Sequence, residues 1–98
     1  MILAKFTYII KEGKRDAFIE AANKIDLINS TRNEKGNISY EYFLPIENEN
    51  AVVCVESWEN DEVFGAHRGT DHVVKFQDVK KEFVVDMVPQ IFCAEQTV

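Results

Sequence analysis

Both histidines of this 98-residue chain lie in one short segment, together with its only tryptophan. The segment runs from Glu56 to Phe76 and places His67 and His72 a few residues after Trp58. Imidazole is the side chain whose unperturbed pKa lies nearest to neutrality, so it can accept and release a proton at physiological pH. Two imidazoles beside an aromatic strand end therefore indicate a candidate site of proton transfer.

The elements around these histidines decide whether they can act together. Residues 51–58 are predicted to form a strand, and a helical region follows from about Asn60 to Phe83. On a continuous helix, positions five apart point about 140° away from each other, so His67 and His72 would not share a face. The run Gly69-Thr70-Asp71 predicts an interruption with Thr70 as a new N-cap. Such a break could bring both imidazoles to one cavity.

The rest of the chain shows a rhythm of strand, helix and strand, which occurs twice. The order of these strands and helices is β-α-β-β-α-β, which predicts an α+β protein. With right-handed crossovers, this order forms a ferredoxin-like plait with a four-stranded antiparallel sheet and both helices on one face. The length fits a single domain over residues 1–98. The other expected elements are strands at 2–11, 38–46 and about 84–94, and one helix from Lys14 to about Glu34.

The expected strands carry apolar residues on both faces, although the helices would cover only one. The second face is therefore expected to be buried against another copy, giving a homodimer that closes as an α/β barrel. Pro89 lies in the last strand and cannot donate a ladder hydrogen bond, so it indicates a sheet edge or a bulge.

Composition restricts the possible partners. The net charge of −6 argues against a nucleic-acid or anionic-membrane partner, since binding to phosphates needs clustered Lys and Arg. The N-terminal strand lacks the features of a signal peptide or a membrane span. Cys54 and Cys93 are far apart in sequence and are expected to be reduced and buried. These features predict a cytoplasmic protein.

Each candidate site residue has a functional and a structural interpretation. His67 and His72 are candidate general bases or polar residues that stabilise the helical region. Glu56 shares a strand face with Trp58 and could orient a histidine or form a salt bridge. Two histidines without a third ligand do not predict a metal site. The candidates for substrate binding, each of which could instead be core or dimer packing, are Trp58, Tyr40, Tyr42, Phe64 and Phe76.

Over essentially its whole length the chain resembles the antibiotic biosynthesis monooxygenase domain family, small dimeric α/β-barrel proteins that include quinol monooxygenases acting without a cofactor. The resemblance implies a homodimer that needs no cofactor. Thr7 departs from several members, which place an asparagine there that polarises the substrate. The matching residues are Glu56-Ser57-Trp58-Glu59, Phe64, His67, Thr70, His72 and Phe76.

The resemblance leaves three functions open. The first is a monooxygenase that oxidises a small aromatic quinol-like substrate with dioxygen, using a histidine as general base. The second is an isomerase or tautomerase of a small carbonyl compound, with Arg68 or Lys75 as an anchor for a phosphate group. The third is a non-catalytic domain that binds a small ligand. Haem degradation is disfavoured, because Gln77 stands where haem-degrading relatives carry the iron-ligating histidine.

Overall fold

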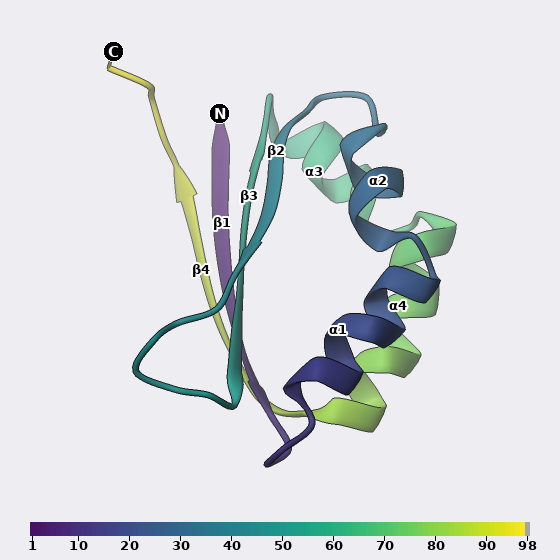
Figure 1. The fold of residues 1–98 in the computed structure, drawn as a ribbon. Helices are drawn as coiled ribbons and strands as arrows, with labels where there is room; N and C mark the ends of the chain where they lie inside the picture. Colours follow the sequence, from purple (N-terminus) through teal and green to yellow (C-terminus); the bar gives the residue numbers. More distant parts are fainter. Residues whose placement is uncertain (98) are drawn as a thin grey trace.

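The structure is a computed structural model that describes residues 1–97 of the chain. Its helices gather on one side of a single twisted sheet (Figure 1). Among the described residues, no helix has both the length and the apolar character needed to cross a bilayer. The elements in chain order are β1 (Ile2–Ile10), α1 (Arg15–Lys24), α2 (Leu27–Arg32), β2 (Asn37–Phe43), β3 (Ala51–Trp58), α3 (Asp61–His67), α4 (Asp71–Phe83) and β4 (Val84–Cys93).

The sheet has the strand order β2-β3-β1-β4, and every neighbouring pair is antiparallel. This arrangement confirms the predicted α+β class and ferredoxin-like plait. β4 is an edge strand, and its Pro89 lies opposite Phe6 of β1. The predicted edge position of this proline is therefore confirmed, because an edge strand does not need a second set of ladder donors.

The first helical region is divided, so the prediction of one helix from Lys14 to Glu34 is wrong. Asp26 adopts a left-handed conformation with φ of 52° and separates α1 from α2. Aspartate tolerates this conformation better than most residues because its short side chain hydrogen-bonds locally. Here Asn29 Nδ2 donates to Asp26 Oδ1 over 3.1 Å. The apolar stripe continues through the break and conceals it from a periodicity argument.

The core lies between the helices and the sheet. Tyr8 of β1, Phe18 of α1 and Phe76 of α4 contact one another, with ring centroids 5.9–6.0 Å apart. Val52 and Cys54 of β3 are fully buried beside them. Alternate residues of the central strands thus face the helices, as the period-two pattern predicts.

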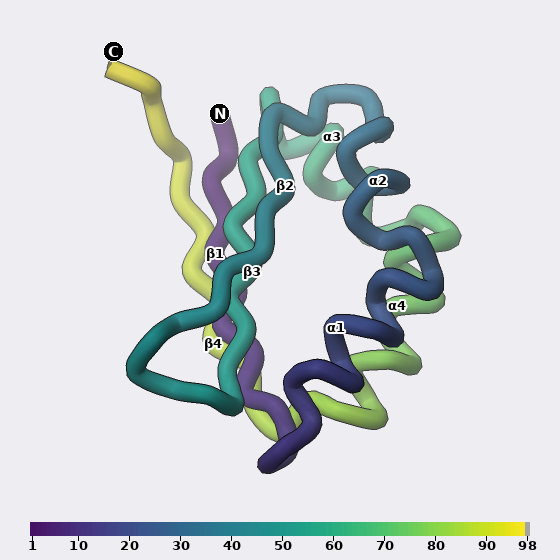
Figure 2. Tube along the Cα trace, in the orientation of Figure 1, coloured from purple at the N-terminus to yellow at the C-terminus, as the bar shows by residue number. Residues whose placement is uncertain are grey.

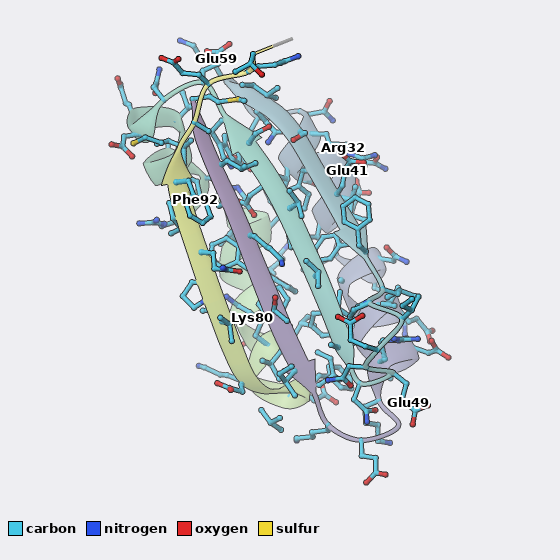
Figure 3. The ribbon with its side chains drawn as sticks, turned by 90° about the vertical axis from the view of Figure 1, so that its left-hand side faces the viewer. Arg32, Glu41, Glu49, Glu59, Lys80 and Phe92 are labelled. Carbon is cyan, nitrogen blue, oxygen red and sulfur yellow. The ribbon has the colours of Figure 1, made fainter. Side chains whose placement is uncertain are left out.

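The opposite sheet face has no helix over it in the single chain. Figure 3 turns this face toward the reader and shows Phe92 on β4. Phe92, Val88 and Phe43 are each about half exposed there. Its burial by a second copy stays a prediction.

The two cysteines are both free, but only Cys54 is buried. The predicted burial of Cys93 is wrong for the single chain. Cys93 ends edge strand β4, whose residues are almost all exposed because the strand extends beyond the cover of the helices.

Candidate active site

The junction between α3 and α4 positions both histidines. Asn60 caps the N-terminus of α3, because its Oδ1 accepts a hydrogen bond from the Val63 amide over 3.0 Å, and the helix ends at His67. Thr70 is extended and precedes α4, which begins at Asp71, so the predicted break is confirmed. The Thr70 hydroxyl donates to the carbonyl of His67 over 2.7 Å instead of capping α4. This hydrogen bond fixes the turn between the two helices.

Glu34 connects the two imidazoles. Its Oε2 lies 2.6 Å from Nδ1 of His67 and 2.8 Å from Nε2 of His72. The two imidazole centroids are 6.0 Å apart, and all three side chains are largely buried. The break therefore brings the histidines to one carboxylate.

The α2–β2 loop carries Glu34 to α3. Gly36 in this loop has φ of 82°, and a Cβ at this position would come within 2.6 Å of the Val63 side chain. The Glu59 amide also donates to the Gly36 carbonyl over 2.9 Å. Figure 2 shows this loop and α3 at the same end of the molecule. Glycine thus permits a close contact that places Glu34 beside His67.

The sequence analysis missed Glu34 because 33 residues separate it from His67. Glu34 also stood at the end of what was expected to be a single helix. The available signal was its place just before the helix-stopping Lys35-Gly36-Asn37. That signal marks a loop but gives no direction for the side chain.

The hydrogen bonds define the protonation pattern of the histidines. When Glu34 is ionised its carboxylate can only accept, and Nδ1 of His67 and Nε2 of His72 then each carry the proton that it accepts. Neutral His67 then keeps its lone pair on Nε2, where it can accept a proton. Nε2 of His72 also lies 3.2 Å from the Thr70 oxygen. Glu34 and Thr70 therefore restrain His72, whereas Nε2 of His67 stays available.

Glu56 lies on the other side of His67, on the helix-facing side of β3. Its Oε1 accepts from Nε1 of Trp58 over 3.0 Å and lies 4.0 Å from Nε2 of His67. The Cys54 thiol donates to Oε2 over 3.4 Å. Burial raises the pKa of Glu56, and the hydrogen bond from Trp58 and the nearby His67 oppose the rise. The carboxyl group therefore holds its proton more tightly than an exposed glutamate.

A cavity of about 180 Å³ adjoins these groups, between the sheet and helices α3 and α4. Five of the twelve side chains in its wall are phenylalanine or tyrosine, and its acidic and basic groups come from β3 and from the α3–α4 region. The side chains that line it are Phe6, Tyr8, Tyr40, Glu56, Phe64, His67, Arg68, Val73, Phe76, Gln77, Lys80 and Met87.

Of the predicted catalytic residues, His67 and Glu56 line this cavity. His72 does not belong to its lining and lies behind His67, on Glu34. Trp58 is also absent from the lining; it is fully buried, with its ring centroid 4.7 Å from that of His67. The two imidazoles and the indole thus form one cluster, but only one of the three rings borders the cavity.

The predicted substrate-binding residues also lie in different places, and only some of them line the cavity. Tyr40, Phe64 and Phe76 line the cavity. Tyr42 instead lines a second hollow beside α1, and its hydroxyl lies 2.7 Å from that of Tyr40. Burial raises the pKa of both tyrosines well above the usual range, so their phenols stay protonated and can donate hydrogen bonds.

The cluster also contains a possible set of metal ligands. Glu34 Oε2, His67 Nδ1 and His72 Nε2 all lie within 4.8 Å of one another. Two imidazoles and a carboxylate suit zinc and other transition-metal ions. The sequence analysis counted two histidines without a third ligand, and Glu34 supplies the missing donor. In the structure, hydrogen bonds satisfy these three groups.

Comparisons with known proteins agree with this architecture. The family model described as antibiotic biosynthesis monooxygenase matches residues 1–79. The chain belongs to this family. The Bacillus subtilis protein named "Putative monooxygenase YcnE" is 30% identical over 84 residues, which are 86% of each chain.

Solved structures show the same fold. Protein SO0527 from Shewanella oneidensis has a TM-score of 0.83 at 28% identity, covering 93% of this chain and 87% of that one. A Nitrosomonas europaea structure has a TM-score of 0.86 at 19% identity, covering 96% and 98%. At these identities the family and fold are defined, whereas the reaction must be argued from the site.

Proposed function

We propose that this protein is a cofactor-independent monooxygenase that oxidises a small aromatic quinol-like substrate with dioxygen, with His67 as the general base. The observation that carries the proposal is the 2.6 Å hydrogen bond from His67 Nδ1 to Glu34, which leaves Nε2 free to accept a proton. His67 also lines the aromatic cavity.

The first step is removal of a hydroxyl proton from the quinol by Nε2 of His67. Glu34 stabilises the imidazolium that forms, because the carboxylate already accepts a hydrogen bond from Nδ1. A positioned base of this kind contributes about 10²–10⁴-fold to a rate. The phenolate is electron-rich enough to pass electrons to dioxygen.

The overall reaction balances without an added reductant. One oxygen atom enters the ring and the other leaves as water, and the substrate supplies all four electrons that dioxygen takes up. The proton held by His67 returns to the oxygen that leaves. Glu56 can supply the second proton of this water, since burial favours its protonated form, and it regains a proton from the second hydroxyl of the substrate.

The cavity wall supports this chemistry. Phe6, Phe64 and Phe76 present apolar rings around the base. Such a wall limits water around a reactive phenolate and strengthens the interaction of its charge with His67. Trp58 holds the His67 ring from the buried side through ring contact.

We further propose that the protein works as a homodimer, closing as an α/β barrel through the open sheet face. The half-exposed Phe43, Val88 and Phe92 on this face support the proposal. Burying such a face would also enlarge the modest core of a chain of this size.

Oxygen uptake with metal-free and flavin-free protein tests the monooxygenase proposal. We expect uptake with at least one member of a hydroquinone panel, and a loss of about 10²–10⁴-fold in kcat for His67→Gln. The exposed Lys24→Gln variant is the control, because Lys24 pairs with Glu20 outside the site. Uptake that is equal in wild-type and His67→Gln protein would exclude His67 as the base.

The same protein is then incubated with carbonyl compounds in heavy water without oxygen. Proton exchange into the substrate, combined with no oxygen uptake by the wild type, would favour an isomerase in place of the monooxygenase. Ligand binding without either reaction would favour a binding domain.

A further inference from the structure

We infer that the cavity takes a single-ring aromatic compound that carries an anionic substituent such as a carboxylate, with Arg68 and Lys80 as its anchors. This inference specifies the substrate class of the proposed function and rests on that function for the chemistry of the ring. The binding itself depends only on the cavity, its size and its two cations.

The two cations lie over the aromatic wall. The Arg68 guanidinium carbon is 4.6 Å from the centroid of Phe64, and the Lys80 ammonium is 5.2 Å from that of Phe76. Both side chains line the cavity. Cation–π contacts hold a positive group over a ring but leave its charge without an anion.

Neither cation has a carboxylate partner. Across residues 1–97, no salt bridge within 4.0 Å involves Arg68 or Lys80. Lys75 on the same helix shows the contrast, since it pairs with Asp71 over 3.1 Å on the surface. What distinguishes Arg68 and Lys80 is that both line one cavity, where two cations without a carboxylate partner favour an anionic ligand.

Burial makes the lack of a partner costly for Lys80. Desolvation lowers the pKa of this lysine, and Glu56 opposes the change. A ligand carboxylate beside Lys80 would restore a favourable environment for the ammonium group. Lys80 was not a candidate in the sequence analysis, because nothing in a helical pattern distinguishes it from Lys81.

The size of the cavity fits one aromatic ring. An apolar cavity of about 150 Å³ is large enough to bind benzene. The cavity here is about 180 Å³, which leaves room for small substituents on such a ring. Its five aromatic side chains offer edges and faces against which a flat ring can pack.

Burial also gives the ligand an orientation. Glu56 and His67 are 3% and 7% exposed, whereas Arg68 is exposed and Lys80 is partly exposed. The proton-transfer groups therefore lie deep in the cavity and the cations lie nearer to solvent. A ring that places its hydroxyl group at His67 would hold its carboxylate between the cavity and water, where the desolvation cost of the anion is small.

Titration calorimetry with 4-hydroxybenzoate and its uncharged isostere 4-hydroxybenzamide tests the inference. At neutral pH and low salt, we expect the acid to bind at least about tenfold more tightly than the amide. Lys80→Met and Arg68→Met should each reduce this preference by about three- to tenfold, because each removes one charge and keeps an apolar stem. Binding of the amide should stay within about twofold of wild type.

Lys75→Met is the matched control and should leave the preference unchanged, since Lys75 points to Asp71 outside the cavity. Thermal unfolding checks that each variant is folded. Equal binding of acid and amide to the wild type, no measurable binding of the acid, or an unchanged preference in both cavity variants would overturn the inference.

The result is separable from the monooxygenase proposal. If the acid binds through Arg68 and Lys80 but neither 2,5-dihydroxybenzoate nor any member of the hydroquinone panel consumes oxygen, the reaction is wrong and the ligand class stands. If uncharged hydroquinone is oxidised through His67 and the acid does not bind, the ligand class is wrong and the reaction stands.

Discussion

Glu34→Gln is the substitution that most directly tests how the site works. Oε2 of Glu34 accepts hydrogen bonds from both His67 and His72, at 2.6 and 2.8 Å. Glutamine keeps one acceptor oxygen but replaces the other with an amide that only donates. Both imidazole contacts therefore lose their charged acceptor, and both lose any acceptor if the amide nitrogen takes the place of Oε2.

The effect on stability follows from this count. A hydrogen bond to a charged group contributes about 1.5–3 kcal/mol, so we expect the free energy of unfolding to fall by about that amount. The effect on catalysis should be larger. If the new amide donates to Nδ1 of His67, the imidazole proton moves to Nε2 and the base is lost. In serine proteases the corresponding change to the wrong tautomer lowers kcat about 10⁴-fold. We expect a loss of about 10²–10⁴-fold here.

Three measurements check this prediction. Urea unfolding gives the stability, oxygen uptake gives kcat, and ¹⁵N NMR of the imidazoles gives the tautomer without any substrate. The wild type should show an unprotonated Nε2 in neutral His67, and the variant a protonated one. Glu20→Gln is the matched control, because the Glu20 side chain on α1 is exposed and lies outside the site. A variant that keeps both the wild-type tautomer and the wild-type kcat would refute the role given to Glu34.

Three further predictions concern the surroundings of the site. The pKa of Glu56 is raised in the folded protein, so wild-type stability falls as the pH rises from about 4.3, the pKa of an unfolded glutamate, up to the folded pKa. Glu56→Gln removes this loss, so its free energy of unfolding should rise relative to wild type over that pH range. Equal pH profiles of the two proteins in urea unfolding would contradict this prediction. Gly36→Ala should lower the free energy of unfolding by about 1–3 kcal/mol, because Gly36 has a positive φ and an added Cβ would overlap with Val63. Gly65→Ala inside α3 has open space around it and should raise the free energy of unfolding by up to about 1 kcal/mol. Thermal unfolding compares the two variants. Val88→Lys should convert a dimer to a monomer in analytical ultracentrifugation, and a wild type that is already monomeric would remove the dimer proposal.

Sequence reasoning reached the fold because strand alternation and helical periodicity repeat over many residues. It also found the break before α4, since Gly69 and Thr70 are chemically suited to interrupt a helix. The break at Asp26 left no comparable signal, because the apolar stripe continues on both sides of it. Glu34 and Lys80 were missed because their roles depend on where the chain directs one side chain, which spacing along the sequence does not specify.

The two helix breaks together explain why the cluster forms. Without the left-handed turn at Asp26, α1 would continue in its own direction and the loop with Glu34 would not follow the path of α2. Without the turn at Thr70, His67 and His72 would lie on different helix faces, and one carboxylate could not accept from both. Both irregularities are costly to a helix, and both direct side chains to the same oxygen atom. The two breaks therefore join Glu34 to His67, the pair on which the proposed proton transfer depends.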